Sequence, residues 1–371
     1  MRSLYHPRGG RMALSRRKKI AFAFVATGLS LFLVSLAMLA ADLLLHFRAE
    51  RSAGLNRHGY RGPVVGAKAD RELRIVMLGG STVFGYGVGW NESIPFVLET
   101  KLRERVQRPV RVINLGFNNE GAFAFLPNLE DFEHLDYDIV VLYEGYNDLP
   151  GDDDVNRAVY RRNSMIYRLT GYYPILPLYL EEKAKMLRYG NDLNVAYEAD
   201  RRQERGDNTV VFNPGLAQRT SAGVMEAIAA MTKALDGQLV ERQRSRAGLP
   251  ESQSALGCKY PHVTYCDSVA AAVRFARGKG KRVVVVSQPR LPGPRSFEFH
   301  TSQHAELAGL MSRVFGNDRG VIWADLSNLL DLKDPDITFD AMHLNPQSNA
   351  KVAAALVEPV LAVEKTLGVD E

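Results

Sequence analysis

Ser81 lies in a glycine-rich stretch, RIVMLGGSTVFGYGVG (residues 74–89), whose chemistry could be of two kinds. A glycine-rich loop can cradle a phosphate, or it can present a serine as a nucleophile. A dinucleotide-binding loop needs glycines at positions i, i+2 and i+5, and no glycine in this stretch starts that spacing. A triphosphate-binding loop needs a lysine directly after its second glycine, where this sequence has Tyr86. The spacing therefore favours the nucleophile.

Ser81 needs a base to act as a nucleophile, because a free serine hydroxyl reacts slowly. Near the C-terminus, FDAMHLNPQSNAKVAAAL contains Asp340 and His343 just before a predicted helix. His343 can accept the proton of Ser81, while Asp340 orients the imidazole ring and stabilises its charged form. The alternative is a surface histidine with an acidic residue nearby by chance.

The same chemistry requires hydrogen-bond donors for a developing oxyanion. Asn147, in LYEGYNDLPG, follows a predicted strand and can donate its side-chain N–H, although alone it would also fit an Asx-turn. The stretch VINLGFNNEGAFAF offers two glycine N–H groups, those of Gly121 and Gly116. We expect Gly121, Asn147 and the N–H of Ser81 to form the oxyanion hole, with Gly116 as the alternative glycine.

Five short apolar runs indicate the elements that must position these side chains. Nearly continuous apolar runs suit strands that are covered on both faces, as in a parallel sheet with crossover helices. Residues 92–106 and 268–280, which lie between such runs, have helical patterns. The sequence therefore predicts a three-layer α/β/α sandwich with a mostly parallel sheet. The runs are residues 74–78, 110–114, 138–143, 282–287 and 321–326.

Taken together and in this order, the motifs resemble the SGNH (GDSL-type) hydrolase superfamily. GGST stands for its first block, NLGFNNEG for the second, GYND for the third and DAMH for the last, over residues 73–361. The resemblance implies a flavodoxin-like hydrolase fold and serine ester chemistry without a metal or an organic cofactor. GGST departs from the usual GDSL, and Asn119 stands where the family has its oxyanion glycine, so Gly121 is preferred. GLNRHGYRGP is similar to the lead-in of membrane-anchored bacterial members.

The N-terminus predicts a membrane anchor. Residues 1–19 carry seven cations and no acid, and residues 20–41 carry no charge over a length that can span a bilayer. The positive-inside rule then keeps the tail in the cytoplasm and places the rest on the periplasmic side of the inner membrane. A cleaved signal peptide is the alternative, although its apolar region is usually shorter. We expect a tail (1–19), a signal anchor (20–45), a connector (46–72) and a hydrolase-like domain (73–371).

The charge distribution argues against a nucleic-acid partner. Without the seven cations of the tail, the net charge of +5 becomes −2 for the rest of the chain. A nucleic-acid-binding domain would carry its positive charge on the folded body. The remaining partners that we expect are an acyl-ester substrate and the membrane, and the oligomeric state stays open.

The two cysteines, Cys258 and Cys266, are close enough in sequence for a local disulfide. An extracytoplasmic location favours the bond, and two free thiols are the alternative. These two thiols with His262 would not complete a tetrahedral zinc site, so no metal is expected.

Residues 149–247 interrupt the alternation of strands and helices and are much longer than a normal connection. An insertion at this edge of a sheet suits a lid or a substrate-recognition element. Its aromatic and proline-rich part, MIYRLTGYYPILPLYLEEKAKMLRYG, would suit contact with the membrane, and an additional packed subdomain suits it equally well.

These observations predict a serine ester hydrolase that acts on acyl esters of lipids or envelope glycans at the outer face of the cytoplasmic membrane. An O-acyltransferase that modifies envelope glycans would use the same three side chains. A non-catalytic envelope-binding protein is the third alternative, and it leaves the filled reactive positions unexplained.

Overall fold

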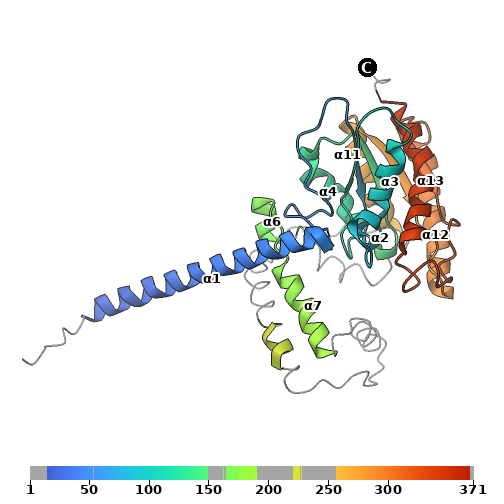
Figure 1. Ribbon diagram of the computed structural model, residues 1–371. Helices are drawn as coiled ribbons and strands as arrows, with labels where there is room; N and C mark the ends of the chain where they lie inside the picture. The colour runs from blue at the N-terminus through green and yellow to red at the C-terminus, as the bar shows by residue number, and fades with distance from the viewer. Residues whose placement is uncertain are drawn as a thin grey trace, which may run out of the picture.

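The computed structural model describes residues 15–52, 54–148, 162, 164–189, 220–225, 227 and 256–367. A long helix, α1 (Arg16–Ser52), extends away from a body built around one sheet (Figure 1). Among the described residues, Arg16–Arg48 is the one stretch of helix with the length and mean hydropathy, 2.3, of a membrane span. The helix continues to Ser52, past residue 45 where we expect the anchor to end.

The body contains a five-stranded sheet in the order β2-β1-β3-β4-β5, and every neighbouring pair is parallel. All five predicted runs are strands, which confirms the parallel sheet. Four strands are buried along almost their whole length, and β5, at an edge, is more exposed. The strands are β1 (Leu73–Leu78), β2 (Val110–Asn114), β3 (Ile139–Tyr143), β4 (Arg282–Ser287) and β5 (Val321–Asp325).

Helices cover both faces of the sheet, as predicted for a three-layer sandwich (Figure 1). Helices α3 (Ile94–Arg103) and α13 (Pro346–Glu364) share one apolar cluster with residues of the strands. Helices α4 (Phe125–Asp131), α11 (Val263–Gly278) and α12 (Pro294–Leu310) contribute to the cluster on the other face. Pro95 lies in the first turn of α3, where its missing N–H costs no helical hydrogen bond.

The strand order fixes where a ligand can bind. From β1 the chain first crosses to β2 on one side and then returns to β3 on the other side of β1. In sheets of this flavodoxin-like order, the reversal leaves a crevice at the carboxyl ends of the strands beside it. Ser81 follows β1 and Asn147 follows β3, so both lie at this switch point.

Shorter elements complete the described structure. Helix α2 (Ser81–Phe84) follows β1 directly, and α6 (Met165–Thr170) and α7 (Leu176–Arg188) are parts of the predicted insertion. Much of the rest of residues 149–247 lies outside the described residues. The single-turn elements are η1 (Trp90–Glu92), η2 (Ala122–Ala124), η3 (Glu133–Leu135), η4 (Tyr146–Asp148) and η6 (Met311–Phe315).

The predicted disulfide is present. Cys258 and Cys266 are bonded at a Cα–Cα distance of 6.5 Å, and both are buried. The bond joins the segment before α11 to the first turns of that helix, so it fixes how the chain enters the sandwich after the insertion.

Candidate active site

Ser81 is presented by a tight turn between β1 and α2. The two glycines before it lie so close to their neighbours that neither has room for a side chain. A Cβ on Gly79 would overlap the carbonyl oxygen of Tyr143, and a Cβ on Gly80 would overlap the side-chain amide of Asn147. Ser81 itself is 9% exposed, and its hydroxyl lies at the start of α2.

The opposite end of α2 is held by Arg61, from the segment we expect to be a connector. Its guanidinium donates hydrogen bonds to the carbonyl oxygens of Phe84, Gly85 (2.6 Å) and Val88 (2.5 Å). A cation at a helix C-terminus also interacts favourably with the helix dipole. Burial lowers the pKa of Arg61 to about 10, with Glu92 opposing the shift, and the group remains charged at neutral pH.

The structure brings Ser81, His343 and Asp340 into one hydrogen-bonded chain. Nε2 of His343 lies 2.8 Å from Oγ of Ser81, and Nδ1 lies 2.7 Å from Oδ2 of Asp340. These distances are those needed for proton transfer from a serine to an oriented imidazole. The ring of Tyr86 lies beside the imidazole, with 4.7 Å between the two ring centroids.

The backbone of the DAMH turn helps to hold His343 and Asp340 in place. The other carboxylate oxygen of Asp340, Oδ1, accepts hydrogen bonds from the backbone N–H groups of His343 (2.8 Å) and Met342 (3.1 Å). Ala341 adopts a left-handed φ of 68°, and its N–H donates a hydrogen bond to Oγ1 of Thr338. The strain of this turn is thus offset by side-chain hydrogen bonds that hold Asp340 and His343 in place.

Asp340 is ionised at neutral pH. Partial burial would raise its pKa, but the hydrogen bond and the charge of His343, with the two backbone N–H groups, hold the pKa below its ordinary value. A carboxylate in this state stabilises the imidazolium that forms when His343 takes a proton.

Three candidate donors lie in the turn that carries Ser81 and in the two loops that approach this turn at Gly80. Within the described part of the chain, the N–H groups of Ser81 and Gly121 have no hydrogen-bond acceptor. The side chain of Asn147 donates to the carbonyl oxygen of Glu120, 3.1 Å away, and therefore lies between the second and third blocks. Unused N–H groups beside a nucleophile are what an oxyanion hole requires.

The alternative glycine, Gly116, has a different environment. Its N–H already donates to Oδ1 of Asn114, 3.0 Å away. A Cβ at this position would overlap the backbone of α2 at Val83 and Phe84, so the glycine allows α2 to pack closely against this loop. Of the two glycines, Gly121 is therefore the one whose N–H has no acceptor among the described residues.

Sequence reasoning missed Glu144, the buried carboxylate at the end of β3. Oε1 accepts N–H groups from Gly145 (2.9 Å) and Asn147 (3.0 Å), and Oε2 accepts the N–H of Gly80. Burial raises the pKa of Glu144 to about 7, although these N–H groups act to lower it. Glu144 thus ties the turn that carries Ser81 to the loop that carries Asn147.

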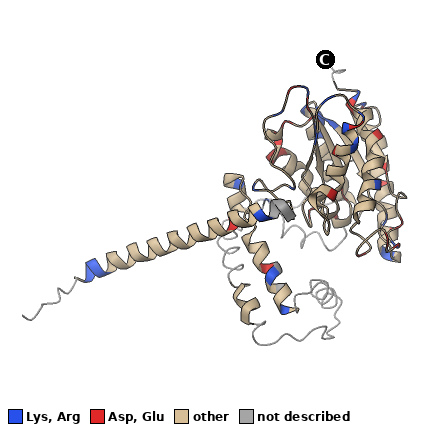
Figure 2. Ribbon diagram, viewed as in Figure 1, with Lys and Arg blue, Asp and Glu red and all other residues tan. Residues whose placement is uncertain are grey.

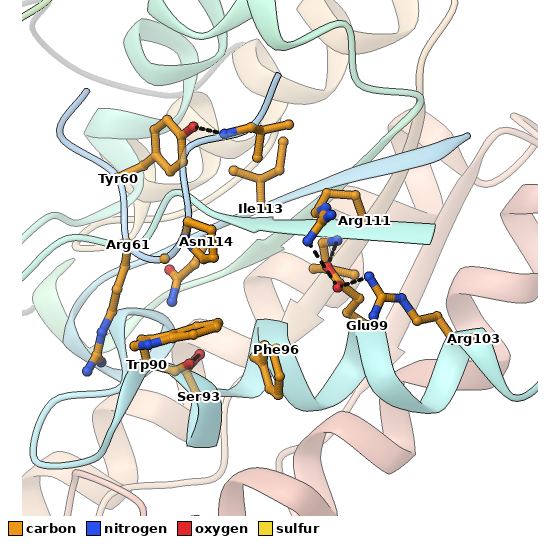
Figure 3. A pocket seen from close by; sticks show the side chains of 14 residues that line it. Tyr60, Arg61, Trp90, Ser93, Phe96, Glu99, Arg103, Arg111, Ile113 and Asn114 are labelled. Atoms are coloured by element: carbon orange, nitrogen blue, oxygen red, sulfur yellow. Dashed lines mark hydrogen bonds and ion pairs between the residues drawn. The ribbon is translucent and has the colours of Figure 1, made fainter. Parts of the chain in front are cut away.

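A pocket of about 120 Å³ lies between β2, α3 and the segment around Arg61, and Ser81 does not line it. It is lined by Arg61 together with Trp90, Phe96 and residues of β2 (Figure 3). Its one carboxylate, Glu99, is paired with Arg103 and Arg111 and accepts the N–H of Val112 at 2.8 Å. The arginines and the backbone N–H pair this carboxylate, so the pocket holds a structural ion pair and not a reactive carboxylate.

No cluster of three His, Cys, Asp or Glu side chains is arranged to hold a metal ion in the part of the chain that the structure describes. His300 and His304 are buried near Tyr146, and burial lowers their pKa values to about 3 and about 4. Both are therefore neutral packing groups at neutral pH.

No family model matches the sequence, and no curated protein matches it either. Similar solved structures include a member of the lipolytic protein G-D-S-L family from Veillonella parvula, with 10% identity and a TM-score of 0.39 over 77% of this chain and 97% of that one. The psychrotrophic esterase EstA from Pseudoalteromonas sp. has 11% identity and a TM-score of 0.40 over 79% and 98%. A variant of Axe2, an acetyl xylan esterase from Geobacillus stearothermophilus, has 10% identity and a TM-score of 0.40 over 78% of this chain and 94% of that one. At this low identity, the chemistry of this chain has to be inferred from its own side chains.

Proposed function

We propose that the protein is a serine ester hydrolase of the SGNH type. The observation that carries the proposal is the chain of hydrogen bonds from Ser81 through His343 to Asp340. In this mechanism His343 takes the proton of Ser81 as the hydroxyl attacks an ester carbonyl, and Asp340 stabilises the resulting imidazolium. The N–H groups of Ser81 and Gly121 and the amide of Asn147 stabilise the tetrahedral oxyanion.

Collapse of this intermediate releases the alcohol, which takes its proton from His343, and leaves an acyl group on Ser81. Water then attacks the acyl-enzyme, with His343 again acting as the base. Every proton that moves passes through the same nitrogen, Nε2, which is the one that faces the serine.

We further propose that the site works at the outer face of the cytoplasmic membrane, on acyl esters of lipids or envelope glycans. Support comes from α1, where basic residues precede a long stretch without charged side chains (Figure 2). A helix of this composition suits insertion with its N-terminus in the cytoplasm. The disulfide between Cys258 and Cys266 suits the oxidising side of that membrane.

A fluorophosphonate probe tests the chemistry directly, because it reacts with activated serines. We expect the folded full-length protein to be labelled at Ser81 and to hydrolyse p-nitrophenyl acetate, and the Ser81→Ala variant to do neither. An unlabelled wild-type protein would refute the proposed mechanism.

A further inference from the structure

The C-terminal part of α1 is joined to the predicted insertion by two buried polar side chains. Asp42 and His46 lie one helical turn apart, and each is 3% exposed. Oδ1 of Asp42 accepts the N–H groups of Ile175 (2.8 Å) and Leu176 (2.5 Å), where α7 begins. A carboxylate at this place satisfies N–H groups that have no partner within a helix.

Two more hydrogen bonds complete this junction. The hydroxyl of Tyr172 donates to Oδ2 of Asp42, and Nε2 of His46 donates to the carbonyl oxygen of Tyr173 over 2.8 Å. Buried polar groups are stable only when they are hydrogen-bonded, so these contacts fix residues 172–176 onto α1. The helix is therefore part of the folded body and not a simple tether.

The length of α1 indicates the depth at which this junction lies relative to the membrane. The uncharged residues 20–41 span about 33 Å as a helix, close to the roughly 30 Å thickness of a bilayer's hydrocarbon core. If the basic residues mark the cytoplasmic boundary, the outer boundary falls near Ala41. Asp42, the next residue, then lies at the level of the lipid headgroups, and α7 runs across the direction of α1 there (Figure 1).

Helix α6 presents an apolar face at the same level. It ends at Thr170, two residues before Tyr172. Ile166 and Leu169, one turn apart, are 41% and 75% exposed, and Leu169 is as exposed as Phe24 within the uncharged part of α1. Tyr167, on the opposite face, is buried against Tyr173 with 5.9 Å between ring centroids. The inner face thus fixes α6 to the junction while its apolar side chains point outward.

We propose that residues 164–180 form a lipid-docking surface, in which Ile166 and Leu169 enter the outer leaflet of the bilayer while Asp42 and His46 hold the segment at that depth. The proposal rests on the proposed insertion of α1 in the membrane. Helices with an apolar face bind at the boundary between headgroups and acyl chains. The neighbouring Arg168 is exposed and suits anionic headgroups.

The same segment connects the membrane level to the nucleophile. The ring of Tyr173 packs edge-on against Phe117 (5.3 Å between centroids), and Phe117 packs against Phe84 of α2 (6.4 Å). Ser81 begins α2, so the lipid-docking surface and the nucleophile share one packed unit. This arrangement would hold Ser81 at a constant height above the bilayer.

An environment-sensitive fluorophore tests the surface in the full-length protein. Leu169→Cys and, as the control, Ala354→Cys on the exposed face of α13 would each be labelled with NBD and reconstituted in vesicles of phosphatidylcholine and phosphatidylglycerol. The native cysteines are disulfide-bonded, so the dye reacts with the introduced thiol alone. We expect blue-shifted emission and quenching by brominated lipids at position 169 and water-like emission at position 354. Water-like emission at both positions would overturn the proposal.

Activity provides the second measurement. Leu169→Glu is expected to lower the turnover of a vesicle-borne acyl ester several-fold more than the turnover of soluble p-nitrophenyl acetate, and an equal effect on both esters would count against the surface. Failure of the proposed function is distinguishable, because it would remove fluorophosphonate labelling of Ser81 and leave the NBD spectra unaffected.

Discussion

In two regions of the molecule, a buried carboxylate joins two segments of the chain by accepting their hydrogen bonds. At the carboxyl ends of the strands, which we call the sheet edge, Glu144 accepts the N–H groups of Gly80, Gly145 and Asn147. It thereby joins the ends of β1 and β3 beside Ser81. Near the C-terminal end of α1, Asp42 accepts two backbone N–H groups and a tyrosine hydroxyl, and joins α1 to the insertion. In the proposed function, the first carboxylate positions the reacting groups and the second positions the whole site at the membrane. Changes at the sheet edge should therefore alter chemistry, and changes at the junction should alter placement.

Ser81→Ala, which removes the proposed nucleophile, should separate chemistry from membrane placement most strongly. We expect Ser81→Ala to lower kcat on p-nitrophenyl acetate by roughly 10⁴-fold or more, because the remaining donors and the binding site supply only part of the catalysis. The measurement is steady-state hydrolysis with the unfolding transition as a control. An NBD label at position 169 should report the same environment as in the wild type, and a change there would break the separation.

Asn147→Ala tests the oxyanion donors of the sheet edge. Loss of one such donor costs roughly 10²–10³ in kcat, and we expect a fall of that size with KM little changed. Steady-state kinetics on the soluble ester would measure it. A variant with wild-type kcat would exclude Asn147 from the oxyanion hole.

Glu144→Gln tests the carboxylate that orients the nucleophile turn. The amide places a donor opposite one of the three N–H groups, and one such mismatch costs about 1–3 kcal/mol, so kcat should fall roughly tenfold to a hundredfold. Alanine at an exposed glutamate, Glu298→Ala, serves as the control.

Glu144→Gln should also change how the free energy of unfolding depends on pH. The pKa of Glu144 is raised from 4.5 to about 7 in the folded protein, so the folded state binds the proton more tightly. The contribution of this group to stability is fully present below pH 4.5 and is lost as the pH rises through about 7. Denaturant titrations should show this fall in the wild type and not in Glu144→Gln. Equal pH dependence in both proteins would contradict the shifted pKa.

Asp42→Asn should have the smallest effect on chemistry. We expect little change in the hydrolysis of the soluble ester, together with faster hydrogen exchange at the amides of Ile175 and Leu176, which lose part of their acceptor. Exchange mass spectrometry measures this, with the exposed Asp70→Asn as the matched control. If the ester rate fell as far as in Glu144→Gln, the distinction between the two carboxylates would fail.

The parts of the fold and site that depend on local pattern were predictable. Apolar runs identified the five strands, and the parallel order brings residues at their carboxyl ends to one edge. Ser81 directly follows β1 and His343 shortly precedes α13, and the structure brings Nε2 of His343 to 2.8 Å from Oγ of Ser81.

The other positioning groups could not be predicted from local pattern. Glu144, Arg61 and Asp42 are charged residues whose burial arises only from tertiary contacts. Asp42 ends an apolar run and so resembles the boundary of an anchor, and Arg61 stands in a polar segment that resembles a connector. The lead-in GLNRHGYRGP was the one available signal for Arg61, and no periodicity accompanies it.

The contact of Arg61 with the end of α2 has a practical consequence for production of a water-soluble form of the protein. A fragment that starts at Leu73, with the first strand, would lack the guanidinium that satisfies the carbonyl oxygens of Gly85 and Val88. A fragment that starts at Leu55 would retain it. The shortest fragment that keeps this end of the nucleophile helix satisfied therefore begins well before the sandwich does.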